Sequence, residues 1–165
     1  MARIAFKGLQ QYEMQLAKLH GSTREIAEKA VYEGAKIVAD EVKKNLNALN
    51  TTSQTLAIKA YTNNTPTYIT EEAKEGLIKS FGVTPLRDED GYYNVKIGFD
   101  GYNDVVTKKY PKGQPNNMIA RSCESGSSSM IKQPFMRAAV NAKKSEAEQK
   151  MAEIIAAEIE KKMEG

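Results

Sequence analysis

Residues 92–99 alternate between apolar and polar side chains, and this period of two predicts a β-strand. Acidic residues and Gly91 precede it as a turn, and residues 81–87 before the turn favour a partner strand. Because the nitrogen of Pro85 cannot donate to a ladder, we expect a bend or an edge there. The pattern predicts a hairpin over residues 81–99 as the centre of a small antiparallel sheet. Its expected buried face consists of Tyr93, Val95, Ile97 and Phe99.

A long apolar stripe at three- and four-residue spacing predicts a helix over residues 23–48, with charged residues on the opposite side. Ser22 opens a capping-box pattern, which indicates that the helix starts there. A shorter helix over residues 9–19 would precede it and end at Gly21, which suits a left-handed cap. Gly34 inside the long helix would let another element approach closely.

A second long helix is predicted over residues 134–163, with Pro134 at its first position, where a missing N–H is harmless. About 30 residues make a helix about 45 Å long, which exceeds what a small domain needs. We therefore expect its far half to contact a partner chain. The apolar stripe expected at this subunit interface consists of Met151, Ile154, Ile155 and Ile159.

Short helices over residues 71–80 and 117–125 complete the predicted elements, and Thr70 caps the first of them. The sequence predicts a single α+β domain over residues 1–165, in which both long helices pack on the hairpin sheet. Two long loops are expected, over residues 50–69 and 100–116. The first has two interpretations, a flexible surface loop or an arm that becomes ordered against a neighbouring subunit.

The composition of the chain excludes several classes of function. The 165 residues include 24 basic and 21 acidic side chains, and the net charge of +3 is low for a dedicated nucleic-acid binder. No stretch approaches the roughly 20 apolar residues of a membrane span, and we expect a protein without a signal peptide that stays in a cytoplasm. One cysteine excludes an internal disulfide and a cysteine-rich zinc site.

The second loop is locally basic. Lys108, Lys109 and Lys112 stand among tyrosines, a mixture that can contact phosphates. We favour a solvated loop as the explanation of this composition. The functional alternative is a small nucleic-acid-binding module that uses residues 102–112.

No arrangement of residues predicts an active site. Cys123 and His20 are the only thiol and imidazole, they fall in different helices, and we expect a buried cysteine and a histidine at a helix C-terminus. The serine-rich run 125–129 lacks the preceding strand of a nucleophile elbow. The acidic residues near Glu71 and Asp88 lack calcium-loop spacing. We expect no enzyme, no cofactor and no metal.

Short motifs recur in a fixed order along the chain: FKGL (6–9), GAKIVA (34–39), AKEGLIKSFGVTP (73–85), YNVKIGFDGYN (93–103), QPN (114–116), IARS (119–122), ESG (124–126) and QPFMR (133–137). In their order and spacing, and across most of the chain, they resemble the tail-component family of long-tailed bacteriophages and prophages. Three departures from the family pattern are Ser127, where threonine is usual, Ala138, where proline is usual, and residues 50–69, which have no firm counterpart.

The resemblance implies a structural virion protein of the head–tail joining (neck) or tail-completion region. The resemblance implies a homo-oligomeric ring around the DNA channel, with six copies as the expected number. Its implied partners are the connector or head-closure protein, and the tail terminator or tail tube protein. DNA would pass through without sequence-specific binding. The implied location is the virion, with assembly in the host cytoplasm, and the family offers no catalytic residues.

Overall fold

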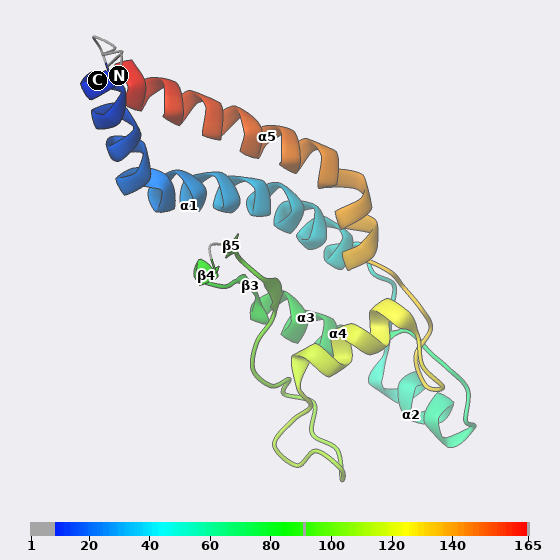
Figure 1. Ribbon diagram of the computed structural model, residues 1–165. Coiled ribbons are helices and arrows are strands. Elements are labelled where there is room, and N and C mark those ends of the chain that lie inside the picture. Colours follow the sequence, from blue (N-terminus) through cyan, green and yellow to red (C-terminus); the bar gives the residue numbers. More distant parts are fainter. Residues whose placement is uncertain (1–8, 91, 165) are drawn as a thin grey trace.

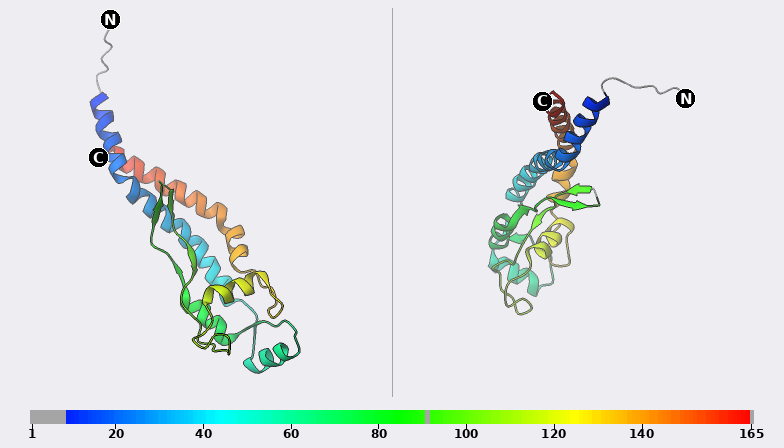
Figure 2. Two further views of the ribbon diagram at one scale, coloured as in Figure 1. Left: turned by 60° about the horizontal axis from the view of Figure 1, so that its bottom comes forward. Right: turned by 60° about the vertical axis from the view of Figure 1, so that its left-hand side comes forward.

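The structure, a computed structural model, describes residues 9–90 and 92–164. Its two longest helices, α1 (Leu9–Asn47) and α5 (Met136–Glu164), lie side by side, and the smaller elements gather along the C-terminal half of α1 (Figure 1). The molecule is elongated, with α2 at one end and the C-terminal end of α5 at the other (Figure 2). The smaller elements are β1 (Thr51–Thr52), α2 (Gln54–Thr62), β2 (Ile69–Thr70), α3 (Glu71–Ser80), β3 (Phe81–Val83), β4 (Arg87–Glu89), β5 (Tyr92–Asn94), β6 (Ile97–Phe99) and α4 (Asn116–Ser125).

The predicted α+β fold and its antiparallel hairpin over residues 81–99 are confirmed. Strand β3 pairs with β6, with Phe81 opposite Phe99, and β4 pairs with β5. Pro85 lies between β3 and β4, and opposite it residues 95 and 96 lie between β5 and β6, so the two ladders are separate. Where they separate, the Thr84 N–H donates to the Lys96 carbonyl at 2.8 Å. Strands β1 and β2 form a separate parallel pair.

The prediction of one unbroken strand over residues 92–99 is wrong. Residues Val95 and Lys96 lie between β5 and β6, and of the expected buried face only Phe99 is fully buried. The side chains of Tyr93, Val95 and Ile97 are half-buried, since over residues 9–90 and 92–164 every sheet is two-stranded and none is large enough to cover the outer part of the hairpin. The alternation of apolar and polar residues over 92–99 therefore predicted the strands correctly, but the predicted burial of their apolar face was too high.

Helix α1 continues through Gly21 and Ser22, so the predicted break and the start near residue 23 are wrong. A glycine in an exposed helix interior costs only about 1 kcal/mol, which packing along a second helix can offset. That second helix is α5: Glu25 on α1 lies 3.9 Å from Lys162 of α5. The hydroxyl of Thr23 donates within the helix, to the Leu19 carbonyl at 2.9 Å.

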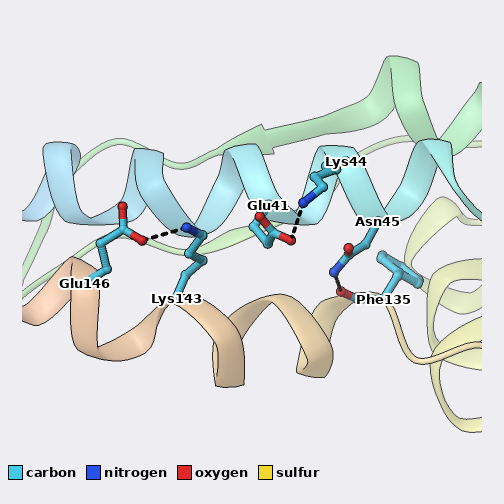
Figure 3. Close-up of polar contacts among 6 residues, drawn as sticks. All are labelled: Glu41, Lys44, Asn45, Phe135, Lys143 and Glu146. Atoms are coloured by element: carbon cyan, nitrogen blue, oxygen red, sulfur yellow. Dashed lines mark hydrogen bonds and ion pairs between the residues drawn. The ribbon is translucent and has the colours of Figure 1, made fainter.

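The α1–α5 seam depends on small residues and on polar contacts. Gly34 of α1 faces Met151 of α5, so the predicted close approach at this glycine is confirmed. Figure 3 shows the other part of the seam, where Asn45 donates to the Phe135 carbonyl at 3.1 Å. Nearby, Lys143 donates to Glu146 at 2.6 Å, and this hydrogen bond raises the pKa of the lysine.

The hydrophobic core lies where the C-terminal half of α1 meets α3, α4 and the hairpin. The Phe99 ring is central to it, with its centroid 5.4 Å from that of Phe81 and 5.9 Å from that of Phe135. This aromatic row ties the hairpin to the start of α5. Its largest fully buried side chains are Phe135, Leu46, Ile69, Leu77, Val42 and Cys123.

The two predicted loops have different outcomes. Residues 50–69 contain β1, α2 and the start of β2, so a loop over that whole range is wrong. Helix α2 has no buried residue, which explains its weak apolar periodicity, and the Ser53 side chain accepts from the Leu56 N–H at 3.3 Å. Among residues 100–115 the structure has no helix or strand beyond an isolated bridge, as predicted.

Three helices start close to their predicted positions. The Thr70 hydroxyl accepts from the Ala73 N–H at 3.3 Å, so the predicted cap of α3 is confirmed. Helix α4 starts at Asn116, and α5 starts at Met136, two residues after Pro134. Gly91 of the predicted turn and residues 6–8 of the first motif lie outside the described residues.

Candidate assembly surfaces

The predicted interface stripe on α5 divides into a packed part and an exposed part. Met151 packs against Gly34 of α1, and Ile154 is half-buried, so these two residues face the molecule itself. The expectation that this half of α5 has no internal partner is therefore wrong. By contrast, Ile155 and Ile159 are 40% and 37% exposed. Four residues apart on a helix, these two side chains lie on the same face.

We call Ile155 and Ile159, with Ala152 and Ala156 beside them, the α5 stripe. All four side chains are exposed, and their helical spacing puts them on one side of α5. The surrounding charge is acidic, since residues 146–164 contain six glutamates and three lysines. One glutamate, Glu158, is engaged in the seam by an ion pair with Lys29, and this hydrogen bond lowers its pKa.

A groove of about 820 Å³ lies at the opposite end of the molecule. Four segments form it: α2, the turn before β2, the basic loop 105–114 and the serine-rich turn 127–129, with α4 beneath. Its apolar lining includes Ile58 and Tyr61 of α2, which are 58% and 80% exposed, together with Tyr68 and Met118. Apolar side chains so exposed, around a concave surface, are typical of a binding site.

Tyr110 fixes the basic loop through contacts with α4 and with its neighbour Lys109. The Tyr110 hydroxyl lies 3.4 Å from the Met118 sulfur, and the Lys109 ammonium lies 5.6 Å from the centroid of the Tyr110 ring. Lys108 and Lys109 both line the groove, whereas Lys112 is exposed in the same loop outside the lining. The structure thus places two of the three predicted lysines in the same groove lining as Ile58 and Tyr61 of α2.

Positive charge is concentrated at the groove end. Residues 51–70 and 101–133, which form this end, contain six Lys or Arg residues and two acidic residues, Asp104 and Glu124. The groove end therefore has a net charge of +4, and the rest of the chain has −1. Glu124 is turned inward, where its carboxylate accepts from backbone N–H groups of residues 135–137. The groove consequently presents a positive surface.

The serine-rich turn is structural. The Ser127 hydroxyl accepts from the Met130 N–H at 3.1 Å, and Gly126 supplies a φ of 78° at the end of α4. Met130 forms an isolated bridge with Thr67, which fixes the turn beside the segment before β2.

The candidate reactive residues lie apart. Cys123 is fully buried, and this burial together with the neighbouring Glu124 carboxylate raises the pKa of its thiol to about 11. His20 is exposed within α1, so its expected position at a helix C-terminus is wrong. Over residues 9–90 and 92–164, no three His, Cys, Asp or Glu side chains are arranged to hold a metal ion. In the same ranges, no helix is long and apolar enough to cross a membrane.

Sequence reasoning missed the groove because four separate segments create it. The available signal was local: Ser53, followed by the helix formers Gln54, Leu56 and Ala57, is an N-cap pattern for α2. Nothing in the sequence placed that helix beside Lys108. Comparison with known proteins found no matching family model, no similar curated protein and no similar solved structure.

Proposed function

We propose that this chain is a structural virion protein of the phage head–tail joining (neck) or tail-completion region, which assembles as a ring around the DNA channel. The observation that carries the proposal is the α5 stripe. Ile155 and Ile159 are exposed although α5 is packed against α1 along its other side. An exposed apolar stripe on a paired helix favours burial against another chain. The motif resemblance described above supplies the biological setting.

In this proposal the chain acts by surface complementarity and carries out no reaction. A ring arises when each copy offers two different contact surfaces and the rotation between neighbours closes. Its neighbours along the virion axis would be the connector or head-closure protein and the tail terminator or tail tube protein. The positive groove end suits a position near DNA, which passes without sequence readout.

Electron microscopy of the purified assembly tests the ring. We expect closed particles with a central opening wide enough for duplex DNA. Compact particles without an opening would contradict the ring. The variant Ile155→Asp is expected to remove the particles, because a buried unpaired carboxylate is costly. Val140→Asp is the matched control, since Val140 is 39% exposed on the same helix and lies outside the stripe.

The charge distribution favours a second candidate, a small nucleic-acid-binding module that uses residues 102–112. Replacement of Lys108, Lys109 and Lys112 by alanine would then abolish a salt-sensitive DNA affinity, since each phosphate contact adds to the salt dependence. A matched control removes the same charge from α5, at Lys144, Lys150 and Lys161. Equal DNA binding by both triple variants would contradict this candidate.

A further inference from the structure

The C-terminal part of α5, which carries the stripe, and α2, which forms part of the groove, lie at opposite ends of an elongated molecule (Figure 2). The two surfaces also differ in shape and charge: the stripe is a convex helix face in an acidic segment, and the groove is concave and basic. Two such surfaces are what a contact between unlike patches of identical chains requires. Neither surface is covered by another described part of the chain.

We propose that the α5 stripe of one copy binds in the groove of a second copy. This inference rests on the proposed function, because it names the partner of the α5 stripe in the assembly. The contact is of the helix-in-groove kind, in which apolar residues four apart on a helix enter an apolar groove. Here those anchors are Ile155 and Ile159.

The apolar parts of the two surfaces match. Ile155 and Ile159 are about 6 Å apart along the helix axis, at 1.5 Å per residue. The groove offers Ile58, Tyr61 and Tyr68 as an apolar and aromatic lining, and its volume of about 820 Å³ is ample for two isoleucine side chains and part of the helix. Tyrosine is a common anchor at protein interfaces because it combines a large apolar ring with a polar tip.

The charges select this pairing over the alternatives. Lys108 and Lys109 line the groove, and the glutamates Glu153 and Glu160 are exposed near the stripe. Contact between two grooves would bring together two ends of net charge +4, and contact between two stripes would bring together two acidic segments. Like charges across an interface disfavour the wrong partner, so stripe-to-groove binding is the favoured arrangement.

The arrangement allows two closed forms. Two antiparallel copies could exchange stripe and groove reciprocally, which gives a pair. Alternatively, each copy binds a different neighbour at each end, which gives a ring if the rotation closes. A pair would support the stripe-to-groove contact and contradict the ring of the proposed function. The two ideas can therefore fail separately.

Mixing of variants tests the contact. Ile155→Asp disables the stripe and leaves the groove, whereas Ile58→Asp disables the groove and leaves the stripe; both sites are exposed, and circular dichroism checks folding. By light scattering, we expect each variant alone to have the mass of one chain. An equal mixture should recover a complex of two chains, through the one intact stripe and the one intact groove. Val140→Asp should keep the wild-type mass.

Four outcomes would overturn the inference. The wild-type protein could be monomeric at every concentration, or the Ile58→Asp variant could keep the wild-type mass. The mixture could stay monomeric, or a groove variant could lose DNA binding without a change of mass. The last outcome would instead favour the nucleic-acid-binding module.

Reversal of the charges on each surface tests the stripe-to-groove contact independently. Changing Lys108 and Lys109 together to glutamate, or Glu153 and Glu160 together to lysine, should weaken self-association about tenfold, since exposed ion pairs contribute up to about 1 kcal/mol each. A mixture of the two double variants should associate more tightly than either alone. Equal affinities in the mixture and in the separate variants would contradict the proposed charge pairing.

Discussion

Met151 of α5 lies directly against Gly34 of α1: a Cβ atom built on this glycine would come within 2.6 Å of the methionine Cγ and 2.8 Å of its sulfur. The Ala147 carbonyl oxygen lies 3.4 Å from the same position. The two long helices thus approach closely at a position where one of them has no side chain. The seam holds α5 so that its stripe faces outward.

Gly34→Val should separate the helices locally. We expect it to lower the free energy of unfolding by about 1–3 kcal/mol, the usual cost of overpacking. Gly21→Val is the control, because the same helix leaves open space around Gly21 and the change there should stay within about 0.5 kcal/mol. Chemical denaturation followed by circular dichroism measures both. Equal effects at the two glycines would contradict the close packing described for this seam.

Glu124 should be important for the start of α5. Its carboxylate accepts from the N–H groups of Phe135, Met136 and Arg137 at 2.9, 2.8 and 3.0 Å, where the helix dipole also favours a negative charge. We predict that Glu124→Ala lowers the free energy of unfolding by about 2–3 kcal/mol, since hydrogen bonds to charged groups contribute most. Glu153→Ala, on the exposed side of α5, should have little effect. A similar stability of both variants would refute this capping role.

Gly113 should be required for the basic loop. It has a φ of 89°, and an added Cβ atom would overlap with the Asn103 carbonyl oxygen. Buried Asn103 holds the loop, because its amide donates to the Ala73 carbonyl at 3.1 Å and its N–H donates to the Gln114 carbonyl at 2.7 Å. We predict that Gly113→Ala lowers the melting temperature and weakens self-association through the groove.

The control for this loop is Gly82→Ala. Gly82 has no neighbouring atom within 4 Å, and its φ lies outside the left-handed region. Thermal unfolding and light scattering are compared for the two variants. A Gly113→Ala protein that melts and associates like the wild type would show that the loop tolerates another conformation.

Cys123 should make stability fall at high pH. Burial raises the pKa of its thiol from an ordinary value near 9.0 to about 11, so the native state keeps a proton that the unfolded state loses. Its contribution to stability is complete below pH 9 and is lost as the pH rises toward 11. At about 1.4 kcal/mol per pH unit, the loss is about 2–3 kcal/mol. Cys123→Ala should show a smaller decline in denaturation experiments from pH 8 to 11, and equal declines would contradict this.

The sequence predicted the elements whose local signals agree with their packing. Thr70 gave the start of α3, Pro85 the interruption between β3 and β4, and Gly34 the close approach of a second helix. It failed where a local signal was weaker than packing: Gly21 and Ser22 indicated a helix end, yet α1 continues there alongside α5. Local stop signals contribute only about 1 kcal/mol, so a long neighbouring helix can override them.

The candidate surfaces were only half predictable. Ile155 and Ile159 followed from helical spacing, and the same spacing could not reveal that Met151 would pack against Gly34. Helix α2 buries no residue, so its pattern lacks an apolar stripe, and the groove needs segments more than 40 residues apart in sequence. Long-range placement of this kind, like the cap that Glu124 provides, has no local signature.

The most direct test of the central claim, that the chain assembles with itself through the α5 stripe, is the solution mass of the wild type and of Ile155→Asp. Light scattering across a concentration series gives both masses. We predict a wild-type mass of several chains, and a mass of one chain for the variant under the same conditions. A wild type with the mass of one chain at every concentration, or a variant with the same multiple-chain mass as the wild type, would contradict the claim.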